Sequence, residues 1–156
     1  MAQPTLPIVE RITQNVLATL QAVGTPAFGI ALSVARSRRQ GDIATPGKIS
    51  GFLKEHDPVP ETATNMHKQW MQPYTLLLQA FESDSSDYSA RSMLQLARCT
   101  AEFALVADIT QGGLAINTII NPSVWLDDAT SKGSIDAIVV VFDIQYRTLL
   151  YNPFSL

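Results

Sequence analysis

The hydrophobic positions between residues 6 and 23 recur at steps of three and four, which is the spacing of an amphipathic helix. Pro7 stands near the start of this stretch, Glu10 falls in its positive first turn, and Gly24 follows its end. The pattern therefore predicts a first helix that lies on a hydrophobic core. Its apolar positions are Val9, Ile12, Val16, Leu17, Leu20 and Val23.

A second helical pattern covers residues 88–108, after a turn of serines and aspartates at 83–87. Arg98 and Glu102 have the spacing of an ion pair on its solvent side. Cys99 falls within the stretch, and we expect it to be a small core residue. The predicted buried side comprises Met93, Leu96, Ala97, Thr100, Phe103, Ala104 and Ala107.

Alternating large and small or apolar and polar residues predict strands at 27–35, 66–82, 114–120 and 135–149. A weaker strand signal lies at 49–54, and Pro58 and Pro60 are expected to end it. Pro73 has no N–H group for a ladder hydrogen bond. The strand that contains it is therefore predicted to be an edge strand or to have a bulge at that point.

The closing strand, residues 135–149, is much longer than the usual ~5–6 residues. One face is apolar along its whole length, with Ile138, Val140, Phe142, Ile144 and Tyr146. The other face begins apolar and turns polar at Asp143, Gln145 and Arg147. We expect the strand to extend past the helix that covers its first half, so that its polar half is exposed to partners.

Two connections complete the pattern: a basic one at 36–48, and a polar excursion at 121–134 around Trp125. Neither a repeat nor a linker interrupts the chain. The predicted fold class is α+β, with a mostly antiparallel sheet of four to five strands packed by two main helices, in a single domain spanning 1–156.

The composition narrows the class of partner. The net charge of −3 argues against nucleic acid as the main partner, because that role needs a broad basic surface. The longest uninterrupted apolar run, Ala137 to Phe142, is far shorter than the ~20 residues of a membrane helix. Without an N-terminal signal pattern, the chain is expected to be made in the cytoplasm.

No motif predicts catalysis, a cofactor or a metal. Residues 41–49 differ from a phosphate-binding loop in their glycine spacing and in having Ile49 where a Ser or Thr is required. His56 and His67 have no cluster of Cys or Glu beside them, and Asp127 and Asp128 resemble solvated turn residues. We therefore expect the protein not to be an enzyme.

The one basic cluster, Arg36, Arg38 and Arg39, has three interpretations. These arginines could be part of a solvated loop, attract the phosphates of passing DNA weakly, or pair with acidic residues of a neighbouring subunit. Trp125 is likewise either a residue at the rim of the core or an interface anchor. The candidate interface residues are Arg36, Arg38, Arg39, Trp125, Asp143, Gln145 and Arg147.

The order of elements and the closing sequence Tyr146-Arg147-Thr148, followed by Asn152-Pro153, resemble the tail-terminator proteins of long-tailed bacteriophages. The last strand of that family often ends in a Tyr-Arg-Thr motif followed by a proline. The resemblance implies a structural protein that forms a ring of six copies on the last ring of the tail tube, stops tube growth and meets the head-side connector.

The implied partners are therefore other copies of the chain, the tail tube protein and the head-side connector, with weak contact to DNA in the lumen. The implied location is the tail or neck of the virion, with assembly in the host cytoplasm. Three alternatives remain: another neck, head-closure or tail-completion protein; a non-viral α+β binding or adaptor domain; and an enzyme whose site has no recognisable motif.

Overall fold

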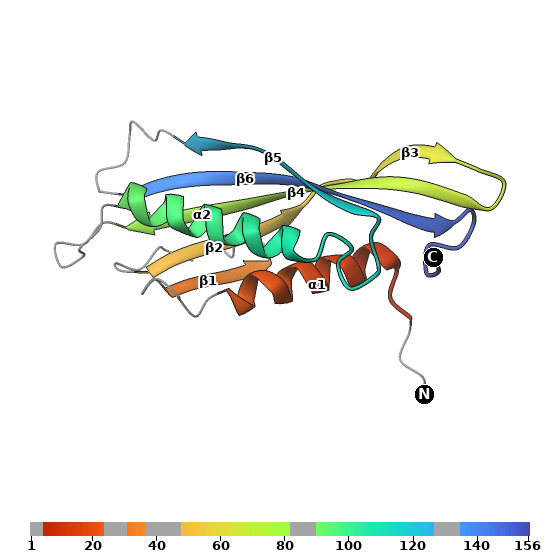
Figure 1. The fold of residues 1–156 in the computed structure, drawn as a ribbon, viewed down its shortest axis with the longest axis horizontal. Coiled ribbons are helices and arrows are strands. Elements are labelled where there is room, and N and C mark those ends of the chain that lie inside the picture. The colour runs from red at the N-terminus through yellow and green to blue at the C-terminus, as the bar shows by residue number, and fades with distance from the viewer. Residues whose placement is uncertain (1–4, 24–30, 37–47, 82–89, 127–134) are drawn as a thin grey trace.

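A computed structural model describes residues 5–23, 31–36, 48–81, 90–126 and 135–156. Two helices lie on one face of a six-stranded sheet (Figure 1), which confirms the predicted α+β class. The elements are α1 (Ile8–Ala22), β1 (Ala31–Arg36), β2 (Lys48–Glu55), β3 (Val59–Ala63), β4 (His67–Phe81), α2 (Ala90–Ala107), β5 (Asn117–Leu126) and β6 (Ile135–Leu149).

The strand order is β1-β2-β4-β6-β5, and the short β3 pairs with β4. Only β1 and β2 are parallel among the described pairs, so the sheet is mostly antiparallel, as predicted. The sixth strand, β3, was not predicted, because all five of its residues are exposed and no apolar alternation marks it. Pro60 does not end a strand but lies within β3, at an edge where proline is tolerated.

The prediction for Pro73 was wrong on both alternatives, since β4 is a central strand and its register opposite β6 is continuous. Pro73 lies where the neighbour on the other side of β4 changes from β2 to β3. Its carbonyl oxygen accepts a hydrogen bond from the His56 N–H at 3.0 Å. The N and C=O of a strand residue point the same way, so the missing N–H faces this gap and no ladder bond is lost.

The hydrophobic core lies between the sheet and the helices, and the predicted apolar face of β6 forms its centre. Ile138, Val140, Phe142 and Ile144 are fully buried. The rings of Phe142 and Tyr74 stack with centroids 5.2 Å apart, and the Tyr74 hydroxyl is hydrogen-bonded to that of a buried threonine on α1 at 2.8 Å. This packing joins β4, β6 and α1.

Helix α1 agrees with the predicted first helix to within two residues at each end. No side chain caps its N-terminus. Instead the Ile8 N–H donates to the carbonyl oxygen of Pro153 at 2.9 Å, and the Leu149 N–H donates to that of Ser155 at 3.0 Å. The segment after β6 therefore supplies a backbone cap to α1 and folds back along the end of β6.

Helix α2 is rotated relative to the prediction. Met93 and Ala97 are buried as expected, but Phe103 is 75% exposed and Cys99 is also exposed. The outer side of α2 is apolar as well, so two faces satisfy helical periodicity, and the sequence pattern does not show which one meets the sheet. The buried residues are Ala90, Met93, Leu94, Ala97, Ala101 and Leu105.

Strand β5 differs from the prediction at both of its ends. It begins at Asn117 instead of residue 114, and it continues to Leu126, where a polar excursion was predicted. A register shift between Asn121 and Val124 accommodates Pro122 within the strand. Trp125 packs against the core, and the Arg91 guanidinium lies 4.2 Å from its ring centroid. Residues 127–134 of the predicted excursion lie outside the described residues.

Beyond the helices, β4 and β6 continue together with β3 as a projecting arm (Figure 1). The arm comprises β3, residues 67–72 of β4 and residues 145–149 of β6. Its existence confirms that the closing strand extends past the helix over its first half. At its base the buried Gln72 side chain donates to the carbonyl oxygens of His56 and Pro73, which fills the gap between β2 and β3.

Candidate assembly interface

Asp143, Gln145 and Arg147 of β6 lie on the sheet face opposite the helices, because they alternate with its buried side chains. Asn121 of β5 donates to the Asp143 carboxylate at 2.7 Å. The Gln145 amide donates to both carboxylate oxygens of Glu61 on β3, at 3.2 and 3.3 Å. These two candidate interface residues therefore tie neighbouring strands to β6 within one subunit.

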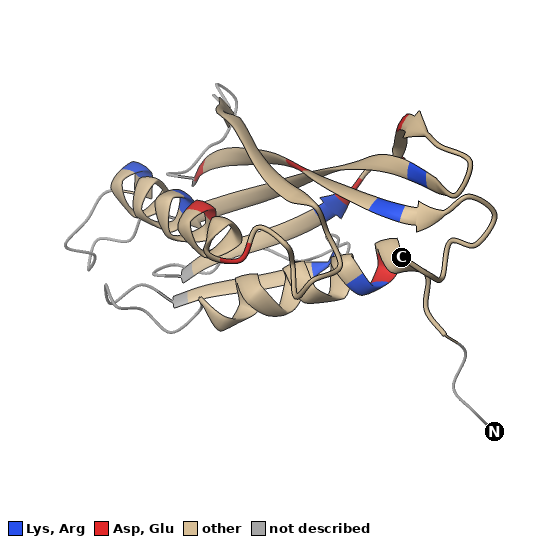
Figure 2. Cartoon of the chain, turned by 45° about the vertical axis from the view of Figure 1, so that its right-hand side comes forward, with Lys and Arg blue, Asp and Glu red and all other residues tan. Residues whose placement is uncertain are grey.

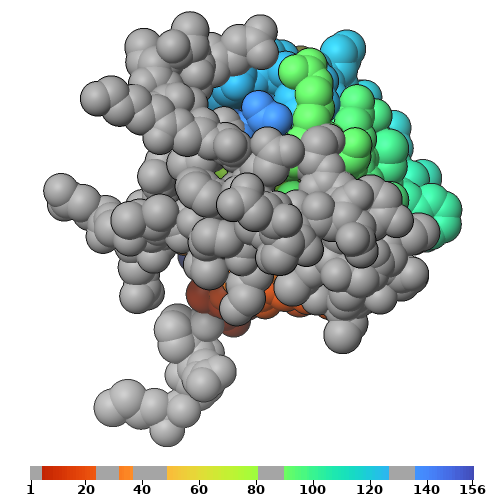
Figure 3. All heavy atoms as spheres, turned by 90° about the vertical axis from the view of Figure 1, so that its left-hand side faces the viewer, coloured from red at the N-terminus to blue at the C-terminus, as the bar shows by residue number. Residues whose placement is uncertain are grey.

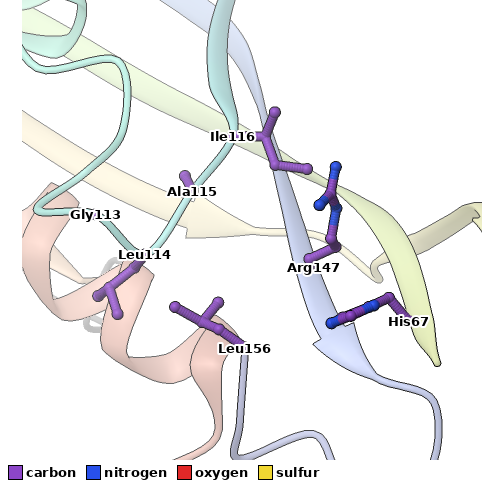
Figure 4. Close-up of a pocket in the computed structure, with 7 residues that line it drawn as sticks. All are labelled: His67, Gly113, Leu114, Ala115, Ile116, Arg147 and Leu156. Carbon is purple, nitrogen blue, oxygen red and sulfur yellow. The ribbon is translucent and has the colours of Figure 1, made fainter.

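Arg147 differs from the other two. Its side chain is exposed, and it forms no hydrogen bond or ion pair with any other residue in the described part of the chain. Arg147 and His67 both line two hollows on the surface. The larger, of about 380 Å³, is lined by His67, Gly113, Leu114, Ala115, Ile116, Arg147 and Leu156 (Figure 4).

The backbone of β6 also changes its partner around Arg147. On the side away from β4, the Gln145 carbonyl accepts from the Ile116 N–H at 2.7 Å, and the Leu149 N–H donates to Ser155. Arg147 lies midway between them, so its own N–H and C=O point to the same side. A free guanidinium beside such a short strand edge is suited to an extended segment that carries a carboxylate.

Arg36 lies in β1 and not in the predicted basic connection, and Arg38 and Arg39 fall outside the described residues. The Arg36 guanidinium donates to both carboxylate oxygens of Glu10, at 2.7 and 2.8 Å, and also pairs with Glu55. Its hydrogen bonds lower the pKa of Glu10, and those to Glu10 and Glu55 raise the pKa of Arg36. Arg36 thus connects α1, β1 and β2 within the subunit.

Replacing Arg36 with alanine should lower the free energy of unfolding by about 1 kcal/mol at pH 7, because a partly exposed paired arginine contributes modestly. The pKa of Glu10 is depressed in the folded state, so the pair stabilises the fold above the ordinary glutamate value of 4.5 and ceases to do so as the pH falls. Urea denaturation at pH 7 and at about pH 3 should therefore show the difference shrinking in acid.

The matched control is Arg11→Ala, since Arg11 is an exposed arginine on α1 for which the structure shows no ion pair with a described residue. Arg11→Ala should leave the free energy of unfolding unchanged at both pH values. A loss for Arg36→Ala that is equally large at pH 7 and pH 3 would show that the side chain acts by packing and not through its carboxylate partners.

Sequence reasoning missed the apolar part of the surface. Phe103 and Val106 of α2 are 75% and 41% exposed, and Val124 and Leu126 of β5 are 54% and 44% exposed. A third group lies at the arm and in the segment that follows β6. It consists of Met66, Tyr151, Phe154 and Leu156. Exposed apolar groups of this kind are typical of contact surfaces, and the only sequence signal for them was the second apolar face of α2.

Metal binding and catalysis find little support among the described residues. Among them no three His, Cys, Asp or Glu side chains are placed to hold a metal ion, and His56 is hydrogen-bonded to Thr75 at 3.1 Å. Burial raises the pKa of Tyr146 to about 12, so this residue of the closing motif is a neutral core side chain. No helix in the described ranges is long and apolar enough to cross a membrane.

No protein family matches the sequence, and no curated protein matches it either. Among solved structures, the chain is similar to one from "Virion of native gene transfer agent (GTA) particle". The TM-score is 0.51 at 11% sequence identity, over 91% of this chain and 92% of that chain. At this identity the likeness shows a shared fold.

Proposed function

We propose that this chain is a structural protein of a phage-like virion. The observation that carries the proposal is the shared fold, which covers nearly the full length of both this chain and a chain of the gene transfer agent virion. The exposed apolar groups on α2, β5 and the arm supply surfaces for contacts with other virion proteins.

Within that class we propose a tail terminator, which forms a ring, caps the tail tube and joins it to the head connector. Two features support this finer assignment. The closing strand carries Tyr146-Arg147-Thr148, which resembles the closing motif of tail terminators. In the structure Tyr146 and Thr148 are buried while Arg147 is exposed and unpaired among the described residues, so one residue of the motif is available to a partner.

Electron microscopy of particles produced without this chain tests the function. A tail terminator predicts tubes of uncontrolled length that are not joined to heads. A head-closure protein, the alternative within the virion class, predicts tails of normal length beside unjoined heads. Normal particles would contradict both, and would favour a non-viral binding domain.

Arg147→Glu should leave the free energy of unfolding within about 0.5 kcal/mol of wild type, because the side chain is exposed and unpaired among the described residues. Assembly should nevertheless be impaired, since the reversed charge would repel a carboxylate partner. Urea denaturation and the yield of joined particles measure the two effects. Arg147→Lys, which keeps the charge, is the matched control. Loss of soluble Arg147→Glu protein would show instead that the role of Arg147 is internal.

A further inference from the structure

The outer side of α2 carries an uncharged stripe opposite its buried side. The stripe, called here the α2 stripe, consists of Leu96, Cys99, Phe103 and Val106, which follow one another at steps of three or four. Phe103 is 75% exposed, the highest value for any large apolar side chain of a described helix. The green and teal side chains of α2 stand at the molecular surface in the end view (Figure 3).

A second apolar surface crosses the sheet on the face away from the helices. Phe52 pairs with Leu77, Leu77 with Val139, and Val139 with Val124, so that four strands contribute to one row. We call this the sheet row. Its exposure rises from 8% at Phe52 to 54% at Val124, next to the exposed Leu126. The sheet row is therefore open mainly at its β5 end.

The four residues of the sheet row are uncharged, and charged residues on that face flank the row. Lys54 and Asp143 lie toward the arm, where Asp143 is already bound to Asn121, and Lys48 begins β2 at the opposite end. Figure 2 shows the strands beneath the helices mostly in tan. The continuous apolar run Ala137 to Phe142 is typical of a strand covered on both faces, yet both helices lie on the same face.

We propose that the α2 stripe of one copy packs on the sheet row of the next copy. The two surfaces belong to opposite layers of the same subunit, so each copy offers one to each neighbour. Such a contact is head-to-tail, and it closes into a ring when the rotation between copies permits. A second copy would place a helix on the exposed β5 end of this face, as α1 and α2 already pack on the other face.

The dimensions of the two surfaces match. The 18 residues of α2 span about 27 Å, and the eight residues from Tyr74 to Phe81 of β4 span about 26 Å. The sheet row crosses four strands, about 19 Å, and Phe52 at its far end is only 8% exposed. The accessible part is therefore smaller than the ~600 Å² per partner of a specific interface, so a single contact should be weak and assembly should depend on concentration.

The test uses two single variants of the full chain, Phe103→Glu and Val124→Glu. Both side chains are more than half exposed, so the fold should be retained, as thermal melting will show. Each variant should weaken association at least ~30-fold and sediment as a 17.0 kDa monomer at about 100 μM, where the wild type associates. The matched control is Val59→Glu, at a 51% exposed valine on the arm, which should associate like the wild type.

An equimolar mixture of Phe103→Glu and Val124→Glu is decisive, because one intact contact remains possible between them. The mixture should form a species of two copies and nothing larger. A monomeric wild type, a Val124→Glu variant that assembles normally, or a mixture that stays monomeric would each overturn the inference.

The inference deepens the proposed function by naming the contact between copies of a ring, and it rests on that function only for ring closure. The two can fail separately. A chain that assembles through these surfaces but is never found in particles would remove the proposed function alone. A chain found in particles whose association ignores both variants would remove the inference alone.

Discussion

Replacing Phe142 with alanine is expected to lower the free energy of unfolding by about 3–5 kcal/mol, because the ring is fully buried and the cavity it leaves cannot be refilled easily. The substitution also removes the stacking partner of Tyr74 at the centre of the sheet. Urea denaturation at neutral pH measures the loss. Since the free energy of unfolding of such domains is only ~5–15 kcal/mol, the variant should be only marginally stable.

Phe103→Ala is the matched control for this prediction. The same side chain is removed, but from a position that is 75% exposed, so the change in stability should stay within about 0.5 kcal/mol. A large loss for Phe103→Ala together with a small one for Phe142→Ala would contradict the observed orientation of α2 and β6.

The second large effect is expected at Gln111, a buried residue with a positive φ of 49° that follows α2. Its amide nitrogen lies within hydrogen-bonding distance of the Leu105 and Asp108 carbonyls and of the Thr118 hydroxyl, at 3.0–3.2 Å. Its amide oxygen accepts from Asn15 at 3.1 Å. One side chain therefore connects α1, the end of α2 and β5.

Gln111→Ala should destabilise the fold by about 2–3 kcal/mol, because it leaves several buried polar groups without a partner and does not relieve the positive φ. Asn15→Ala, which removes only one of these hydrogen bonds, should cost about 1 kcal/mol. Thermal and urea denaturation of the two variants compare them. If both variants had the same small effect, Gln111 would not be the centre of the network.

The strongest sequence patterns predicted the fold well, for a physical reason. Residues such as Val140 and Ile144 alternate over a long stretch, and a one-residue slip would expose all of them, so their face is unambiguous. The sequence of α1 has a single apolar side, and its periodicity predicted helix bounds close to those observed. Where only one face of an element is apolar, the pattern also predicts which face meets the core.

The errors arose where two faces or none were apolar. Helix α2 has an apolar outer stripe, so Phe103 fitted the core pattern although it points outward. Strand β3 has no buried residue, and it is held by pairing with β4 and by the contact of Glu61 with Gln145. The role of Pro73 depends on where β2 gives way to β3, which is a long-range property that no local pattern contains.

The candidate interface residues could be selected from sequence, but their partners could not. Arg36 and Arg147 are both arginines near strand ends. Only the folded arrangement shows that Arg36 is bound to Glu10 and Glu55, whereas Arg147 is unpaired among the described side chains. Gln145 was chosen for its polarity, and its contact with Glu61 depends on the unpredicted β3. Among the polar and charged candidate residues that the structure describes, Arg147 is therefore the one whose side chain is left for a partner.

The central claim, a virion protein that caps the tail tube, is tested most directly by electron microscopy of tail tubes mixed with gold-labelled chain. We expect the label at one end of each tube, on the side that meets the head, and none along its length. Label distributed along the tubes, or tubes without label at any end, would contradict the claim.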